Sequence, residues 1–234
     1  MKIATTVECN PTSIDHIGCG EEADVFSFID KYGSKKTIKI YSQSISVNKG
    51  FANVKKDLIE KTNLLRSASK VLKPLLNSEI ELNRNKYYFQ VFDYIDTDLL
   101  SICNNKNGNI NLYEFFIIAL RIVMGVYSLH KANIVHCDIK LENILVNLKD
   151  KKVKLIDFGF TKRIERDCSY IPQGTPVYAS PELKSVLGKI PGYMLFPSDI
   201  YSLGIILYAI FTKSINLPLF HYYKINQKLA PLPY

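Results

Sequence analysis

The sequence of 234 residues contains no tryptophan and only five arginines, so lysine carries most of the positive charge. The net charge of +8 is compatible with acidic partners, with nucleic acid, or simply with solubility. Lysines cluster at residues 35–36, 55–56 and 149–154, but no interleaved aromatic residues and no recognised nucleic-acid-binding module accompany them. We therefore expect a solvated basic surface and no nucleic-acid partner.

Paired cysteines are also absent. The five cysteines are odd in number and widely spaced, and none forms a CxxC pair; they are Cys9, Cys19, Cys103, Cys137 and Cys168. This pattern indicates neither a disulfide framework nor a zinc site. Because unpaired cysteines are typical of reducing compartments, the sequence favours an intracellular, cytoplasmic location.

Long hydrophobic runs are missing as well. The first fifteen residues lack the apolar stretch of a signal peptide. The longest apolar run, Ile200–Phe211, is too short to span a bilayer and predicts a buried helix. We therefore expect no membrane partner, and a protein that is intracellular or exported without a Sec-type signal.

The hydrophobic pattern predicts a strand-rich first part and a helical second part, with a boundary near Asp93–Asp98. No internal repeat or low-complexity tract interrupts this order. The expected elements are, in chain order, three strands within 13–41, a helix over 48–68 capped by Asn48, strands near 75–82 and 87–95, a helix over 111–131, a strand leading into LIDFGF, and a helix near 198–211.

In the first part, Gly18 and Gly20 lie at the predicted turn between the first two strands. Glycines there let backbone N–H groups approach a phosphate chain, although two glycines in a hairpin are often only a turn. Lys39 is centred on an apolar strand, where an unpaired buried charge would be costly. A carboxylate such as Glu60 or a phosphate would pair with it; alone, Lys39 would be a plain surface lysine.

In the second part, the stretch IVHCDIKLENILV (residues 134–146) places His136, Asp138, Lys140 and Asn143 between two strand-like apolar runs. Asp157 follows at the end of the next predicted strand, in LIDFGF. Carboxylate and amide oxygens suit Mg²⁺ better than a softer metal. Because the spacing from Asn143 to Asp157 is that of a short hairpin, we expect both to face one cleft.

Together these residues resemble the motifs of the eukaryotic-type serine/threonine protein kinases, in the order in which that family has them. The resemblance also includes GTPVYASPE (174–182) and SDIYSLGIILYAIF (198–211). It implies an α+β, bilobal protein-kinase-like fold. Residues 1–95 would form a β-rich N-lobe with one main helix, and residues 96–234 a shortened helical C-lobe, with ATP in the cleft.

The resemblance also implies roles for individual residues. Asp138 would accept or orient the proton of the substrate hydroxyl, and Lys140 would neutralise charge on the transferring phosphoryl group. Lys39, oriented by Glu60, would hold the ATP phosphates. Asn143 and Asp157 would hold Mg²⁺. The residues expected at the nucleotide are Gly18, Gly20, Val25, Lys39, Glu60, Asp93, Ile95 and Leu145.

Further roles concern packing and support. Phe92 resembles the gatekeeper, and His136 and Phe158 are expected to pack together in the spine between the lobes. Asp199 is expected to anchor the catalytic loop, and Thr175 to contact Asp138 and Lys140.

The sequence departs from the family pattern at several positions. Ala23 replaces the third glycine of the loop, and Thr37 stands where the family usually has Ala. Cys137 replaces the Arg that pairs with an activation-loop phosphate in many regulated kinases, so we predict that loop phosphorylation is not the on-switch. In the family, the glutamate at the position of Glu182 normally pairs with an Arg in a later helix. In this sequence no Arg follows Glu182. The shortened C-lobe would expose apolar surface for a homodimer or a regulatory partner.

Three functions remain open from the sequence. The first is an active protein serine/threonine kinase that uses ATP and Mg²⁺ on a protein substrate. The second is a pseudokinase or scaffold that binds nucleotide and a partner without turnover. The third, a kinase of small molecules, ranks last because such enzymes usually lack the GTPxYxSPE segment. Small kinases of this style resemble those of large DNA viruses and some bacterial effectors, which would place the chain in a host cell.

Overall fold

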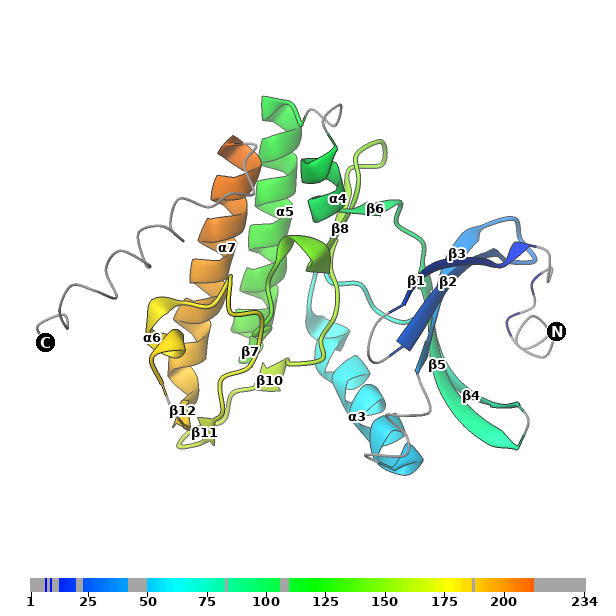
Figure 1. Cartoon of the computed structure of the whole chain (residues 1–234), viewed down its shortest axis with the longest axis horizontal. Coiled ribbons are helices and arrows are strands. Elements are labelled where there is room, and N and C mark those ends of the chain that lie inside the picture. Colours follow the sequence, from blue (N-terminus) through cyan, green and yellow to red (C-terminus); the bar gives the residue numbers. More distant parts are fainter. Residues whose placement is uncertain are drawn as a thin grey trace, which may run out of the picture. The chain divides into compact units, whose positions relative to one another are not determined.

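The computed structural model describes residues 7, 9, 13–19, 23–41, 50–82, 84–105, 110–186 and 188–212. The chain divides into two compact units, Met1–Ile95 and Asp96–Tyr234 (Figure 1). The boundary lies inside the interval 93–98 suggested by the sequence. The first unit is rich in strands and the second in helices, as an α+β protein-kinase-like fold requires.

The first unit is built on one five-stranded antiparallel sheet of order β1-β2-β3-β5-β4. Its strands are β1 (Asp15–Cys19), β2 (Ala23–Ile29), β3 (Lys35–Tyr41), β4 (Leu76–Leu82) and β5 (Asn85–Asp93). Successive side chains of a strand point to opposite faces of the sheet, so every second residue can pack into the same core. That core contains Phe28, Ile38, Ile80, Phe89 and Val91. The predicted three strands within 13–41 are therefore confirmed.

Helix α3 (Phe51–Leu64) belongs to the same unit and continues into a short 3₁₀ turn at Leu65–Ser67. Gly50 occupies the N-cap position without a side-chain cap, while the predicted cap, Asn48, lies outside the described residues. Phe51 and Leu58 pack against a second apolar cluster formed by Ala23, Tyr41 and Tyr88. This contact places the helix against the side chains of Tyr41 and Tyr88, on β3 and β5.

The second unit contains short antiparallel pairings between its helices. Strands β6, β8 and β9 form one small sheet, β7 pairs with β10, and β11 pairs with β12. Their bounds are β6 Thr97–Asp98, β7 Ile134–Val135, β8 Ile144–Asn147, β9 Lys152–Leu155, β10 Lys162–Arg163, β11 Ser169–Tyr170 and β12 Ile190–Pro191. The polar segment 161–174, for which the sequence suggested no element, thus contains two short strands.

The helices of the second unit are α4 (Leu99–Asn104), α5 (Leu112–Lys131), α6 (Pro181–Lys184) and α7 (Leu195–Thr212). Helices α5 and α7 are in contact and lie side by side in Figure 1. Helix α5 begins at a capping box, in which the side chains of Asn111 and Glu114 each accept a hydrogen bond from the other's backbone N–H at 2.9 Å. Helix α7 begins at Leu195, three residues earlier than predicted.

Two stretches, Leu112–Lys131 and Gly192–Thr212, are long and apolar enough to cross a membrane by length and composition alone. Core helices of soluble proteins pass the same test. The second stretch buries Ser198, Asp199 and Ser202 inside its own unit, where they make polar contacts. The finding alone therefore places neither stretch in a membrane.

Candidate active site

The second unit contains a closed polar network around Asp138. Its Oδ1 atom accepts hydrogen bonds from the backbone N–H of Thr175 at 2.8 Å and from Thr175 Oγ1 at 2.6 Å. Its Oδ2 atom lies 2.9 Å from Lys140 Nζ and accepts from Asn143 Nδ2 at 3.1 Å. Lys140 Nζ also donates to Thr175 Oγ1 at 3.1 Å. The predicted contacts of Thr175 with Asp138 and Lys140 are therefore confirmed.

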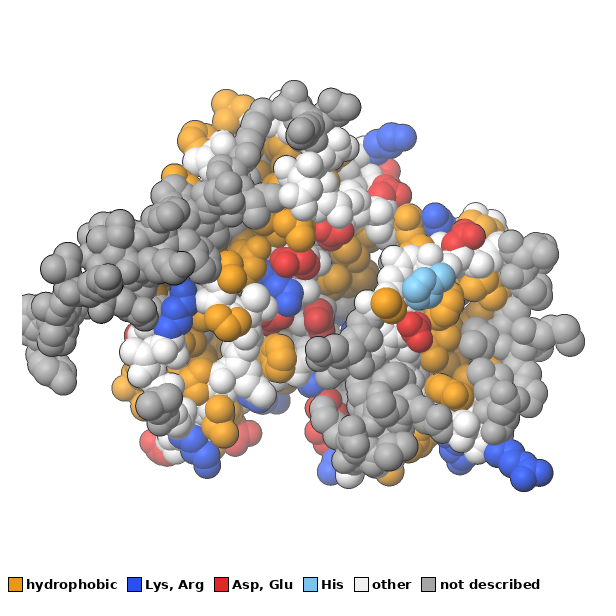
Figure 2. Space-filling view, in the orientation of Figure 1, with side chains coloured by type: hydrophobic (Ala, Val, Ile, Leu, Met, Phe, Trp, Pro, Cys, Tyr) orange, Lys and Arg blue, Asp and Glu red, His pale blue; other side chains and the backbone are white. Residues whose placement is uncertain are grey.

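The environment of Asp138 keeps its carboxylate ionised. Burial by itself raises the pKa of Asp138, which is only 5% exposed. The hydrogen bonds from Thr175 and Lys140, together with the charge of Lys140, more than compensate and hold the pKa below its ordinary value. Acidic and basic side chains lie next to one another on this unit, among hydrophobic ones (Figure 2). At neutral pH the network thus presents a charged acceptor beside a cation.

The loop that carries Asp138 is anchored by Asp199 of α7. Asp199 is 2% exposed, and its carboxylate accepts the backbone N–H of His136 at 2.8 Å and that of Cys137 at 2.9 Å. His130 Nε2 lies 2.9 Å from the same carboxylate. Cys137 has a φ of 67°, which a non-glycine residue rarely adopts without such support. The expected anchoring role of Asp199 agrees with this geometry.

Gly174 is a residue of the site that sequence reasoning missed. Its φ is +123°, and a Cβ at this position would lie 2.1 Å from the carbonyl oxygen of Cys137. Only glycine therefore permits the close approach that places Thr175 on Asp138. The signal for it in the sequence is the glycine directly before Thr175, within the GTPVYASPE motif.

Asn143 and Asp157 lie at the two ends of the β8–β9 hairpin, where Ile144 pairs with Leu155. The backbone N–H of Ile156 donates to the carbonyl of Asn143 at 2.9 Å, which keeps the two ends together. The sequence prediction that a short hairpin brings Asn143 near Asp157 is thus consistent with the structure. His136 and Phe158 also pack, with ring centroids 5.1 Å apart.

The oxygens of these two residues fit a hard cation. Asn143 uses its Nδ2 atom to donate to the backbone and side chain of Asp138, at 2.9 and 3.1 Å. Its Oδ1 atom and the exposed carboxylate of Asp157 have no hydrogen bond or ion pair with any other residue that the structure describes. An amide oxygen and a carboxylate are ligands that Mg²⁺ accepts. Within the described part of the chain, no group of three His, Cys, Asp or Glu residues offers an all-protein metal site.

In the first unit, Gly18, Val25 and Lys39 form one row across three neighbouring strands. Gly18 pairs with Val25, and Val25 pairs with Lys39. Directly opposite residues of antiparallel strands share a face of the sheet, so the three residues lie on the same face. Gly18 belongs to β1 itself and not to the turn, which corrects the prediction; Gly20 lies outside the described residues.

The structure does not bring Glu60 to Lys39. Glu60 is exposed, and its Oε1 atom lies 3.9 Å from Nζ of Lys56, one turn earlier in α3; among the described residues no ion pair joins Glu60 to Lys39. Thr62 faces the sheet, where its Oγ1 atom accepts a hydrogen bond from Gln90 Nε2 at 3.4 Å. Because an α-helix turns once in 3.6 residues, Glu60 lies about 200° away from Thr62 around the axis and points away from the sheet. The expected orienting role of Glu60 is therefore not supported by this geometry.

The remaining predicted nucleotide residues lie at the end of the first unit and in β8 of the second. Asp93 forms an ion pair with Lys36 at 2.8 Å, and Ile95 is buried. Phe92 pairs with Thr37 across β3 and β5. Leu145 is half-buried in β8, opposite Asp98.

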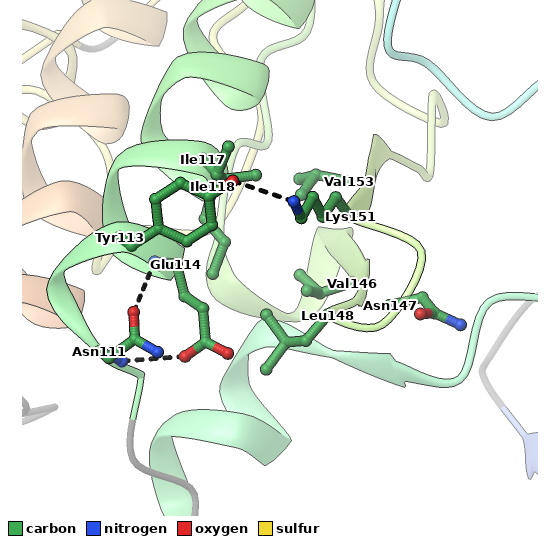
Figure 3. A pocket seen from close by; sticks show the side chains of 10 residues that line it. All are labelled: Asn111, Tyr113, Glu114, Ile117, Ile118, Val146, Asn147, Leu148, Lys151 and Val153. Atoms are coloured by element: carbon green, nitrogen blue, oxygen red, sulfur yellow. Dashed lines mark hydrogen bonds between the residues drawn. The ribbon is translucent and has the colours of Figure 1, made fainter.

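A cavity of about 100 Å³ lies elsewhere in the second unit, between the first turns of α5 and the β8–β9 hairpin (Figure 3). Lys151 donates to the hydroxyl of Tyr113 at 2.9 Å on one side of it. Ile117, Ile118 and Val153 supply much of its apolar wall. None of the predicted site residues lines this cavity.

Comparison with known proteins matches residues 12–229 to the protein kinase domain. Similar proteins include a probable serine/threonine-protein kinase of Dictyostelium discoideum, 30% identical over 77% of this chain and 21% of that protein. Probable serine/threonine-protein kinase HSL1 of Saccharomyces cerevisiae is 34% identical over 57% of this chain and 9% of its own length. Citron Rho-interacting kinase of Homo sapiens is 29% identical over 88% of this chain and 10% of its own length. The matched part of the chain thus spans between 9% and 21% of the length of these relatives.

Proposed function

Because this chain belongs to the protein kinase family, we propose that it is an active serine/threonine kinase that transfers the γ-phosphate of ATP to protein hydroxyls with the aid of Mg²⁺. The observation that carries this proposal is the assembled network of Asp138, Lys140, Asn143 and Thr175. Positioning and charge neutralisation supply most of the catalysis in phosphoryl transfer, and this network offers both.

Each residue of the network has a proposed task. The ionised Asp138 carboxylate orients the substrate hydroxyl and accepts its proton, while Lys140 neutralises charge on the transferring group. The Oδ1 atom of Asn143 and the carboxylate of Asp157 hold Mg²⁺, which supplies further neutralisation of phosphate charge when bound. In the first unit, Lys39 binds ATP phosphates, and Gly18 and Val25, from the same row, contact the nucleotide.

A labelling experiment tests this function. Purified protein with Mg²⁺ and γ-labelled ATP is incubated with generic basic and acidic proteins, and labelled Ser and Thr are identified. Asp138→Asn should remove the labelling, whereas Asp150→Asn, an exposed carboxylate with one ion pair at 3.9 Å, should not. Equal labelling by wild type and Asp138→Asn would show that the activity does not use this network.

Lys39 and Glu60 do not pair with each other: Glu60 lies near Lys56, and Lys39 lies over the ring of Tyr41. This favours a second candidate, a pseudokinase or scaffold that binds nucleotide and a partner without turnover. This candidate predicts ATP binding by calorimetry together with no labelling of any protein. Measurable turnover that disappears in Asp138→Asn would dismiss it.

The exposed face of α5 supports a proposal about partners beyond the protein substrate. Phe116, Leu120 and Tyr127 recur at helical spacing and are 61%, 59% and 65% exposed. Hydrophobic side chains also gather where α5 begins and α7 ends (Figure 2). We propose that a second copy of the chain covers this stripe, because one helix face can pair with itself across a two-fold axis. Light scattering should show a dimer that Leu120→Glu dissociates; a wild-type monomer would contradict the proposal.

A reducing, cytoplasmic compartment is also a proposal. It is supported by the five cysteines, all of which are free thiols. Fractionation of source cells tests it, and detection of the chain outside the cytosol would contradict it.

A further inference from the structure

The ammonium group of Lys39 rests on an aromatic ring. Lys39 and Tyr41 are two residues apart on β3, so their side chains lie on the same face of the sheet. Lys39 Nζ is 5.3 Å from the centroid of the Tyr41 ring. A cation within about 6 Å of a ring centroid is attracted by the negative face of the ring. Tyr41 is therefore a partner that the sequence did not suggest for Lys39.

Tyr41 is itself fixed from two sides. Its ring is 6% exposed and packs with Ala23, Tyr88 and side chains of α3. Its hydroxyl donates to Gln90 Oε1 at 2.7 Å, and Gln90 pairs directly opposite Lys39 on β5. The ring therefore cannot turn away from Lys39 without breaking a buried hydrogen bond.

Gln90 is held just as firmly. It is 5% exposed, and its Nε2 atom donates to Asn77 Oδ1 at 2.7 Å and approaches Thr62 Oγ1 of α3 at 3.4 Å. Both ends of the amide thus have partners, as a buried polar group requires. The contacts form a continuous chain from α3 through Gln90 and Tyr41 to Lys39, within one unit.

We propose that Tyr41, held by Gln90, is a positioning residue for Lys39. The inference rests on the proposed role of Lys39 in binding ATP phosphates. Glu60 does not reach Lys39, and no described carboxylate pairs with it. A ring orients the ammonium without neutralising it, so the full positive charge of Lys39 remains available to phosphate oxygens.

Three variants separate this role from general packing. Tyr41→Leu removes the ring, Tyr41→Phe keeps the ring and removes only its hydroxyl, and Tyr88→Leu removes another buried ring of the same cluster. Tyr41→Leu should raise the dissociation constant and KM for ATP by about 2- to 30-fold, the range of a cation–π contact. Tyr41→Phe should keep most of the affinity. Tyr88→Leu should leave ATP affinity close to wild type despite a comparable loss of core.

A second measurement needs no activity. Lysines are labelled as ¹³C-dimethyllysine, and the Lys39 signal is assigned by its disappearance in Lys39→Arg. In the free protein this signal should be shifted upfield by the Tyr41 ring, should remain so in Tyr41→Phe and Tyr88→Leu, and should return towards the other lysines in Tyr41→Leu.

The outcomes distinguish the two claims. A wild-type protein that neither binds nor turns over ATP would end the proposed function, while the Lys39 signal would still test the contact. An unchanged Lys39 signal in Tyr41→Leu, or equal loss of ATP affinity in Tyr41→Leu and Tyr88→Leu, would overturn the positioning role of Tyr41.

Discussion

Asp199→Asn is the substitution that most directly tests how the loop that carries Asp138 is held. The carboxylate of Asp199 accepts the backbone N–H groups of His136 and Cys137 on different oxygens, at 2.8 and 2.9 Å. Asparagine has nearly the same shape but only one acceptor oxygen. One of the two backbone N–H groups must therefore face an NH₂ group instead of an acceptor.

The loss of one acceptor oxygen determines the expected loss of stability. A buried donor left without a partner costs about 1–3 kcal/mol, and the remaining hydrogen bond weakens because its acceptor is no longer charged. We therefore expect the free energy of unfolding to fall by about 2–4 kcal/mol. Cys137, with its φ of 67°, should relax when its N–H is released. Because Asp138 follows directly, turnover should fall more than tenfold.

Urea unfolding followed by circular dichroism suits this test, since the chain has no tryptophan to report by fluorescence. Asp150→Asn serves as the matched control, because that exposed carboxylate should change stability by less than about 0.5 kcal/mol. If Asp199→Asn unfolds within 0.5 kcal/mol of wild type, the anchoring argument is refuted.

Further predictions concern the same network. Thr175→Val should lower turnover about tenfold or more by removing the hydroxyl between Lys140 and Asp138, while Thr175→Ser should keep most of it in the labelling assay. Burial and the nearby Asp199 raise the pKa of the Cys137 thiol, so mass spectrometry after brief alkylation at neutral pH should find exposed Cys19 modified and Cys137 intact. The lowered pKa of Asp138 stabilises the fold above its ordinary pKa, and this contribution is lost as the pH falls below about 4. Asp138→Asn should therefore show a weaker loss of stability on acidification than wild type.

The arrangement of the loop that carries Asp138 was predictable because its residues are close in the sequence. Asp138, Lys140 and Asn143 lie within six residues, and a short hairpin returns the chain from Asn143 to Asp157. Local geometry therefore fixes their neighbourhood almost regardless of the rest of the fold. The contact to Thr175 was predictable only through the resemblance, since no local rule joins positions so far apart.

The surroundings of Lys39 were not predictable in the same way. Whether a helical residue faces the sheet depends on the rotation of α3, and an error of one or two residues turns a side chain by about 100–200°. Glu60 illustrates this, because it has the right type and approximate distance along the chain but the wrong side of the helix. Tyr41 and Gln90 gave no signal, since a tyrosine and a glutamine in strands are ordinary.

The segment that carries β10, β11 and Tyr170 bears on the prediction that loop phosphorylation is not the on-switch. Its backbone is already paired, β10 with β7 and β11 with β12. The hydroxyl of Tyr170 donates to the carbonyl of Arg163 at 2.9 Å and accepts from the N–H of Glu165 at 3.2 Å. A phosphate on Tyr170 would abolish the donated bond, so it would disturb this arrangement instead of creating it.

The close contact of Gly174 with Cys137 gives the segment a further attachment that needs no phosphate, in place of the ion pair that an Arg at position 137 would make. We therefore expect phosphatase-treated protein to keep its activity, and Tyr170→Phe to lose stability by about 1 kcal/mol through the lost hydrogen bond. Abolition of activity by the phosphatase would show that a phosphate, and not these neutral contacts, places Thr175 on Asp138.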